Sequence, residues 1–395
     1  MAEPANITIT GHAQKAAWDN KTFPAVERIA DSVWSIPVPF PDNPLRYTLS
    51  YLLLGDGEAV VVDPGWNSDE GWEHLLAGLA VAGIGPTQVT CIAVTHYHPD
   101  HHGMTARLQQ ACGAPVAMGQ DERWRSHPAD PSAAAAEDRS QLTFWGVPSD
   151  RLEEIAMPGH RVSVVPALPV PDLRLADGGL LPLAGRSVRT IATPGHTPGH
   201  ICLLDEDNSL LFTGDHVLPR ISPHISLERG GLENPLASYF DSLAVLARRM
   251  GDEGGMGDDG GMGDGGGDGG TGGGRDEGAR DSVEVCPAHE YRFSGIRKRI
   301  AILEAHNRAR SQEVAAVLDA SHPTTVWEVA KELTWSRGWD ALRGYSLRFA
   351  IAETASHLVY LRARGREIGI ETGWIGTETT PGAGPGVEPA LAGNR

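Results

Sequence analysis

The sequence has few cysteines and lacks any paired cysteine motif. Four cysteines occur among 395 residues, namely Cys91, Cys112, Cys202 and Cys286, and none of them forms a C-x-x-C pair. A zinc ribbon and a dithiol redox motif are therefore excluded. Cys91, Cys202 and Cys286 stand in apolar runs, so we expect them to be reduced residues of the protein core.

Long hydrophobic runs and an excess of basic residues are also missing. No stretch is apolar enough to cross a bilayer. The start, Met1 to Asn20, lacks the basic and then apolar order of a secretory signal, so we expect a cytoplasmic protein. The chain carries 51 acidic and 33 basic residues, a formal net charge of −18. This charge disfavours nonspecific attraction to nucleic acid or to an anionic membrane.

A dense cluster of residues that can bind metal follows directly after a predicted strand. Val89–Val94 is an apolar run that predicts a buried strand, and four potential ligands lie just after it: His96, His98, Asp100 and His101. Residues two apart in extended backbone point the same way, so His96 and His98 can share one ion. The proline between His98 and Asp100 turns the chain, so Asp100 and His101 can reach a second point. Imidazole and carboxylate donors suit zinc, iron or manganese.

Residues 96–101, H-Y-H-P-D-H, resemble the H-x-H-x-D-H signature of the metallo-β-lactamase superfamily. Four further segments resemble that family in the same order: residues 62–65 (V-D-P-G), 193–200 (T-P-G-H-T-P-G-H), 212–216 (F-T-G-D-H) and 287–290 (P-A-H-E). The resemblance spans residues 30–305. It implies an α/β protein built as a four-layer αββα sandwich.

The chain divides into segments of different character. An N-terminal arm (1–28) is expected to precede a metallo-β-lactamase domain (29–308). Residues 312–372 resemble the small winged-helix domain that one branch of the superfamily carries. Residues 251–278 are almost entirely Gly, Asp, Glu and Met, so we expect a disordered insertion, because it cannot bury enough apolar surface to offset its ordering entropy. We expect the tail, 373–395, to be disordered as well.

A hairpin is expected to bring further ligands to the metal cluster. Its predicted turn is Asp205–Asn208, between two apolar strands. Pairing outward from that turn sets Asp215 opposite Pro198, close to both His196 and His200. By resemblance His196 is a metal ligand, whereas for His200 we favour a bracing or core role.

The resemblance implies two adjacent metal sites with one bridging carboxylate. We assign three residues to each site and one between them: His96, His98 and His196; Asp100, His101 and His289; and Asp215 as the bridge. Asp63 is expected to brace the metal loop without binding metal. Two divalent ions would share a hydroxide, and we favour zinc over iron or manganese. We predict that Asp100 and Asp215 are the catalytic residues.

The leading functional hypothesis is a dinuclear metal-dependent hydrolase of the hydroxyacylglutathione hydrolase kind, acting on a small ester or thioester. A second is a single-strand endoribonuclease. The net charge opposes this hypothesis. A basic cleft would support it, formed by Arg220, Arg292, Arg297, Lys298 and Arg299. A third is a mononuclear iron oxygenase, which would leave Asp100 and His101 without a role. We expect a small-molecule substrate and no membrane partner, do not favour nucleic acid, and leave homo-oligomer formation open.

Overall fold

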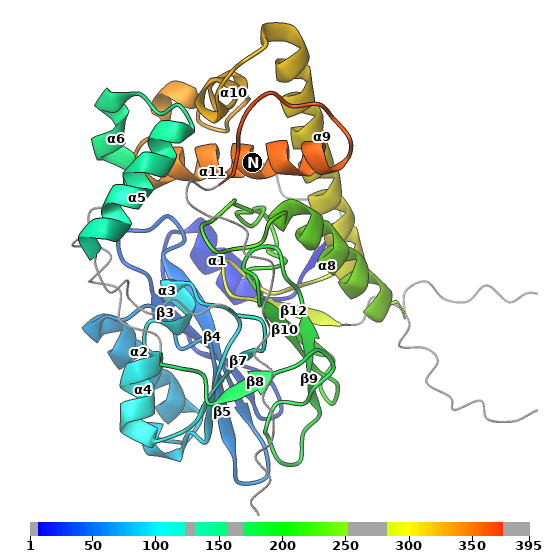
Figure 1. Ribbon diagram of the computed structural model, residues 1–395. Coiled ribbons are helices and arrows are strands. Elements are labelled where there is room, and N and C mark those ends of the chain that lie inside the picture. Colours follow the sequence, from blue (N-terminus) through cyan, green and yellow to red (C-terminus); the bar gives the residue numbers. More distant parts are fainter. Residues whose placement is uncertain (1–6, 123–130, 157–168, 252–282, 374–395) are drawn as a thin grey trace, which may run out of the picture.

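The computed structural model describes residues 7–122, 131–156, 169–251 and 283–373. Figure 1 shows two sheets packed face to face, with helices outside them and a group of helices above one edge. Apart from Gly251 and Gly373, the predicted Gly/Asp-rich insertion and the predicted tail lie outside the described residues. Within the described residues, no helix is long and apolar enough to cross a membrane.

The first sheet has seven strands in the order β2-β3-β4-β5-β6-β7-β8. Its strands are β2 (Glu27–Ala30), β3 (Val33–Pro39), β4 (Tyr47–Leu54), β5 (Ala59–Val62), β6 (Cys91–Val94), β7 (Val116–Gly119) and β8 (Leu173–Leu175). Strands β5 to β8 are parallel. The carboxyl ends of β5 and β6 therefore meet at one edge, which brings Asp63 next to the loop that begins at Thr95.

The second sheet has six strands in the order β1-β13-β12-β11-β10-β9. Its strands are β1 (Thr8–Ile9), β9 (Val188–Ala192), β10 (Ile201–Asp205), β11 (Leu210–Gly214), β12 (Glu284–Pro287) and β13 (Phe293–Ser294). Strand β11 runs antiparallel to β10 and parallel to β12. The ends of β11 and β12 thus reach the same edge, where Asp215 and His289 follow them.

The register of the β10–β11 hairpin differs from the predicted one by two residues. Asp205 pairs with Leu210 inside the ladder, so it belongs to the strand and not to the turn. Its carboxylate is fully buried and forms an ion pair with Arg186, which explains why an acidic residue occupies a strand position. Continued outward, this register sets Asp215 opposite His200, and the predicted pairing with Pro198 is wrong.

Three apolar clusters fill the spaces between the layers and confirm the predicted αββα sandwich. Helices α2 (Asp69–Val81) and α4 (Thr105–Cys112) cover the outer face of the seven-stranded sheet. Helices α8 (Pro235–Arg249) and α9 (Ile296–Ser321) cover the outer face of the six-stranded sheet. Between the sheets, Phe212 packs with residues of both.

The N-terminal residues are part of the domain and not a separate arm. Strand β1 pairs with β13 at the edge of the six-stranded sheet, and α1 (His12–Asp19) follows it. The buried side chain of Gln14 donates to Ser35 Oγ at 3.0 Å and accepts from the backbone N–H of Arg292 at 3.0 Å. These contacts tie the described part of residues 1–28 to both sheets.

A helical cap lies above the edge at which the strand ends meet (Figure 1). It consists of α5 (Pro131–Phe144), α6 (Ser149–Ile155), α10 (Val326–Glu332), α11 (Gly344–Ala363) and the end of α9, with one shared apolar cluster. Three short helical turns complete the described elements: η1 (Pro86–Gln88), α3 (Pro99–His102) and η3 (Trp339–Ala341). No strand follows α11 in the described residues up to 373, so the predicted winged helix is not confirmed.

Candidate metal centre

The predicted ligands come together at the edge where strands of both sheets end. His96 follows β6, Asp215 follows β11 and His289 follows β12, while His196 lies in the loop between β9 and β10. Their ligand atoms form three overlapping groups, each within 4.8 Å: His96, His98 and His196; His96, His101 and Asp215; Asp100, His101 and His289. The structure therefore brings all seven residues into one centre.

The two carboxylate oxygens of Asp215 face different groups of ligands. Oδ2 lies 3.6 Å from His196 Nε2, whereas Oδ1 lies 3.5 Å from His101 Nε2 and 3.3 Å from His289 Nε2. Asp100 Oδ2 lies 3.3 Å from His289 Nε2. Asp215 thus stands between the group around His196 and the group around His289.

Several ligand atoms in this centre are buried without a hydrogen-bond partner in the described structure. They are the Nε2 atoms of three histidines and one carboxylate oxygen: His101, His196, His289 and Asp215 Oδ1. Buried polar atoms in native proteins nearly always have partners. Because these buried atoms belong to clusters of imidazole and carboxylate donors, they fit divalent cations of the zinc type.

The other ring nitrogen of two of these histidines is fixed by an acceptor outside the centre. His196 Nδ1 lies 2.8 Å from the carbonyl oxygen of His224, and His289 Nδ1 lies 3.0 Å from that of Tyr47. A carbonyl oxygen only accepts, so Nδ1 carries the proton and Nε2 presents its lone pair to the centre. Sequence reasoning missed both partners, because a backbone carbonyl has no signature in the sequence.

Asp63 has the bracing role expected of it. Its carboxylate accepts hydrogen bonds from the Thr95 N–H and hydroxyl, both at 2.7 Å, and lies 2.9 Å from His101 Nδ1. Thr95 Oγ1 in turn lies 3.0 Å from His96 Nδ1. One carboxylate therefore orients a histidine of each group, His101 directly and His96 through Thr95.

The charges of the centre favour a bound cation. Burial raises the pKa of the Asp215 carboxyl, but His289 and His101 outweigh burial and hold this pKa well below its usual value. Burial lowers the pKa of His101, yet the Asp215 and Asp100 carboxylates raise it well above 6.5. Burial lowers the pKa of His98 to about 4, which keeps its imidazole neutral. The two carboxylates thus draw positive charge to this point.

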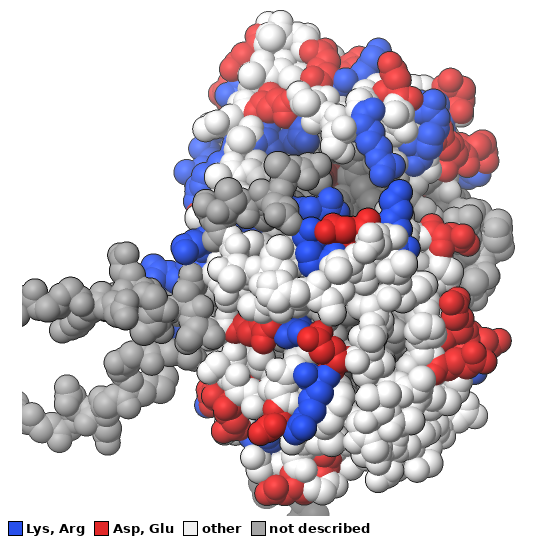
Figure 2. All heavy atoms as spheres, turned by 180° about the vertical axis from the view of Figure 1, so that it is seen from behind, with Lys and Arg blue, Asp and Glu red and all other residues white. Residues whose placement is uncertain are grey.

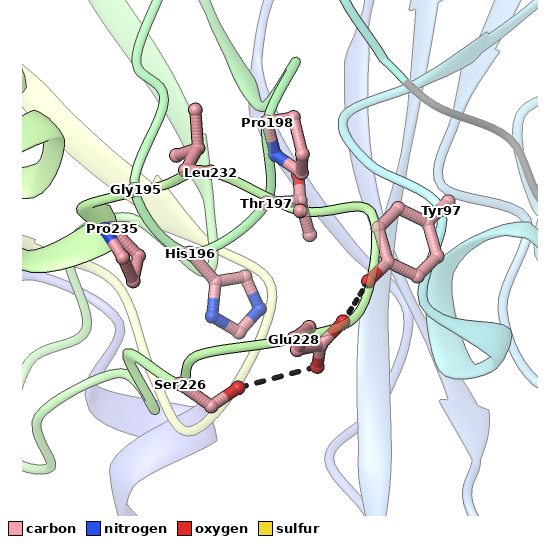
Figure 3. Close-up of a pocket in the computed structure, with 10 residues that line it drawn as sticks. Tyr97, Gly195, His196, Thr197, Pro198, Ser226, Glu228, Leu232 and Pro235 are labelled. Atoms are coloured by element: carbon pink, nitrogen blue, oxygen red, sulfur yellow. Dashed lines mark hydrogen bonds between the residues drawn. The ribbon is translucent and has the colours of Figure 1, made fainter. Parts of the chain in front are cut away.

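A pocket opens beside His196 (Figure 3). On one side Tyr97 and Ser226 donate hydrogen bonds to Glu228, and on the other Leu232 and Pro235 provide apolar surface. The candidate ligand His196 thus borders a pocket that has one polar and one apolar wall.

Comparisons with known proteins show which family this chain resembles. A family model described as Metallo-beta-lactamase superfamily matches residues 43–254. Acyl-coenzyme A thioesterase MBLAC2 of Bos taurus is 28% identical over 242 residues, which cover 55% of this chain and 81% of that protein. A hydroxyacylglutathione hydrolase of Xanthomonas axonopodis is 26% identical over 285 residues, 71% of this chain and 76% of that protein.

A solved structure resembles more of the chain than the family model matches. A metallo-beta-lactamase family protein of Thermus thermophilus superposes with a TM-score of 0.66 at 29% identity. The superposition covers 86% of this chain and 95% of the Thermus protein. The likeness therefore extends well beyond residues 43–254.

Proposed function

The chain belongs to the metallo-beta-lactamase superfamily and is a metallo-hydrolase of that family, and on this premise we propose that it hydrolyses a small ester or thioester at a centre of two divalent metal ions. The position of Asp215 carries the proposal. Its two oxygens face two ligand groups that each hold imidazoles with inward lone pairs. The relatives named as a thioesterase and as a hydroxyacylglutathione hydrolase support the substrate class.

In this proposal each group of side chains holds one ion. His96, His98 and His196 would hold the first, and Asp100, His101 and His289 would hold the second. Asp215, whose two oxygens face the two groups, would serve both. When bound, two such ions supply a nucleophilic water at neutral pH and polarise the carbonyl oxygen of the substrate. We favour zinc, because three imidazoles with a carboxylate form a donor set that zinc accepts readily.

The chain's own residues prepare the site for hydrolysis. The buried positions of His96, His101 and His289 keep bulk water away from the ligand atoms, which strengthens their electrostatic interactions. Asp100 and Asp215 supply negative charge that offsets two dications. Tyr97, Glu228 and Leu232 line the pocket beside His196, and in this proposal they contact the substrate.

The contacts of three arginines make the endoribonuclease alternative less favoured in this proposal. Three members of the basic cleft predicted for it are engaged elsewhere. Arg292 pairs with Glu27 and Glu284, Arg220 pairs with Glu290, and Arg299 donates to backbone carbonyls. On the face in Figure 2, some Lys and Arg side chains lie next to Asp and Glu, and others rim the hollow in the upper half of the view.

The iron oxygenase alternative conflicts with the second ligand group. A mononuclear site would leave Asp100 and His101 without a role as ligands. In the structure, the ligand atoms of both lie together with His289 within 4.8 Å, and the acceptor Asp63 orients His101. Such an arrangement favours two ions.

Metal analysis followed by a substrate panel tests the proposal. Protein purified without added metal and then saturated with zinc should approach two ions per chain by elemental analysis. It should hydrolyse acyl thioesters faster than phosphodiesters or RNA. A reproducible value of one ion, with no gain on adding zinc or manganese, contradicts the dinuclear centre, and turnover confined to RNA contradicts the substrate class.

We also propose a cytoplasmic location. All four cysteines lie outside disulfides, and Cys91, Cys202 and Cys286 are buried as expected. Reduced cysteines are typical of cytoplasmic proteins.

A further inference from the structure

His200 is a buried histidine of the centre that belongs to none of the three ligand groups. Its side chain is 0% exposed, and its ring centroid lies 5.1 Å from that of His96. Both ring nitrogens are engaged: Nδ1 lies 2.8 Å from Thr193 Oγ1, and Nε2 lies 3.3 Å from the backbone nitrogen of Asp215. A backbone N–H only donates, so Nε2 is the acceptor and the proton of His200 sits on Nδ1.

This protonation state leaves His200 without a lone pair for a metal ion. With Nε2 accepting from Asp215 and Nδ1 donating to Thr193, both nitrogens are used. His200 therefore acts on the centre through the backbone of Asp215.

The end of strand β11 is shaped to allow this contact. The pairing of β11 with β12 shifts register between Phe212 and Gly214, and Gly214 has a φ of +48°. A Cβ at position 214 would lie 2.8 Å from His200 Nε2 and 2.7 Å from Thr95 Oγ1. Glycine thus supplies both the left-handed backbone and the room for His200 to reach the next residue.

The loop that carries His200 is itself held rigidly against the first sheet. A Cβ at Gly199 would lie 1.9 Å from the backbone nitrogen of Glu122, so the two backbones are in direct contact. The N–H of Ile201 donates to the Thr95 carbonyl at 3.0 Å, and the N–H of Thr193 donates to the His200 carbonyl at 2.8 Å. These contacts fix the position of His200 relative to Asp215.

We infer that His200 is a positioning residue that fixes the backbone of Asp215 and so aims its two carboxylate oxygens at the two metal sites. The inference rests on the proposed function, in which Asp215 bridges two ions. Asp215 Oδ1 has no hydrogen bond within the described structure, and its neighbours His101 Nε2 and His289 Nε2 lie 3.5 and 3.3 Å away. The backbone that His200 holds therefore helps to set the direction of the carboxylate. Loss of the His200 contact should therefore weaken metal binding at both sites.

Two substitutions at position 200 distinguish the role of the Nε2 contact from that of the Nδ1 contact. In His200→Gln the amide oxygen lies near the former Nε2 and can still accept from Asp215, whereas in His200→Asn the shorter amide reaches only toward Thr193. Removing an outer partner of a metal ligand typically costs 10- to 100-fold in metal affinity or activity. We expect a loss of about that size in zinc affinity and kcat for His200→Asn, an unchanged KM, and recovery of most of the loss in His200→Gln.

Zinc affinity is measured on the metal-free protein by competition with a chromophoric chelator, with His196→Ala as the reference for a deleted ligand. This readout needs no substrate. If the wild type hydrolyses no ester or thioester, the proposed function fails, while the affinities still decide the role of His200. Wild-type affinity in His200→Asn would overturn the inference, and so would a loss in His200→Gln as large as in His196→Ala, which would make His200 a ligand.

Thr193→Val keeps the inference testable if His200→Asn does not fold. Valine preserves the shape of Thr193 but removes the acceptor for His200 Nδ1, which frees the ring to rotate. We expect a smaller loss of zinc affinity in the same direction, with circular dichroism unchanged. A folded Thr193→Val variant with wild-type zinc affinity would count against the positioning role.

Discussion

Oδ2 of Asp63 lies 2.9 Å from Nδ1 of His101, a residue 38 positions further along the chain. The same buried carboxylate accepts from the N–H and the hydroxyl of Thr95. Strand β5 is thereby joined to the metal loop after β6 by a single side chain. Asp63 should therefore affect both the stability of the fold and metal binding at the candidate centre.

Asp63→Asn tests this coupling. The amide keeps the size of the side chain, but its nitrogen cannot accept from His101 or from Thr95. We expect about a 10- to 100-fold loss of metal affinity and a loss of about 1–3 kcal/mol in the free energy of unfolding, because buried donors lose their acceptor. Chelator competition and urea denaturation measure the two effects.

Asp69→Asn is the matched control for Asp63→Asn. Asp69 lies in the first turn of α2, and its side chain is 93% exposed beside Arg107. Exposed ion pairs contribute little to stability. Equal losses in the two variants would show that the effect at Asp63 is a general consequence of removing a carboxylate.

Asp215→Asn tests the proposed bridge. The substitution keeps the shape of the side chain but removes its charge and one strong donor atom. We expect metal content to fall below two ions per chain and turnover to be lost, while circular dichroism stays unchanged, because the hairpin strands keep their apolar contacts. Two ions and near-normal turnover would mean that Asp215 does not bridge.

Asp207→Asn is the control for the bridge. Asp207 is exposed in the turn of the same hairpin and accepts from the N–H of Ser187, a bond that the amide oxygen can keep. Metal content and turnover should match the wild type. Asp205 is unsuitable as a control, because it is buried and paired with Arg186.

His357 predicts a specific pH dependence of stability. Burial lowers the pKa of His357 to about 3, against about 6.5 in an unfolded chain. The neutral ring, 2.8 Å from Ser311 Oγ, therefore stabilises the fold fully above about pH 6.5, and this contribution is lost as the pH falls toward 3. Binding of one such proton by the unfolded chain makes the free energy of unfolding change by about 1.4 kcal/mol per pH unit in this range.

Replacing His357 should flatten the pH profile by this amount. We expect the free energy of unfolding of metal-free His357→Asn to change less steeply than that of the metal-free wild type between about pH 6 and pH 4. Metal-free protein is used so that metal release does not contribute. His12→Asn, at an exposed position of α1, should leave the slope unchanged, and parallel profiles for wild type and His357→Asn would contradict the prediction.

The Gly/Asp-rich segment provides a prediction about residues outside the described structure. Replacing Asp252–Gly274 by a short Gly-Ser linker should leave Tm and metal content nearly unchanged, because the segment lacks core-forming residues. The packed residues on either side, Met250 and Val283, belong to the cluster beneath α8 and must be kept. A drop of many degrees in Tm would show that the segment stabilises the fold.

The sequence by itself determined the features that depend on neighbours along the chain. Four of the seven proposed ligands lie within residues 96–101, so the end of one strand was enough to place them together. The strand over residues 89–94 and the hairpin around residues 205–208 follow from apolar runs and a turn between them, which are local properties. The order of the family segments then indicated the sandwich.

Only the tertiary structure decided the features that depend on packing between distant segments. Hairpin register was one of them, because the ion pair of Asp205 with Arg186 keeps Asp205 inside the strand and sets Asp215 opposite His200. Another was the engagement of Arg220, Arg292 and Arg299, three of the five residues of the predicted basic cleft, by acidic side chains and backbone carbonyls. The carbonyls of Tyr47 and His224 fix the histidine tautomers, and contacts of this kind arise when the backbone of one segment is folded against the side chain of another.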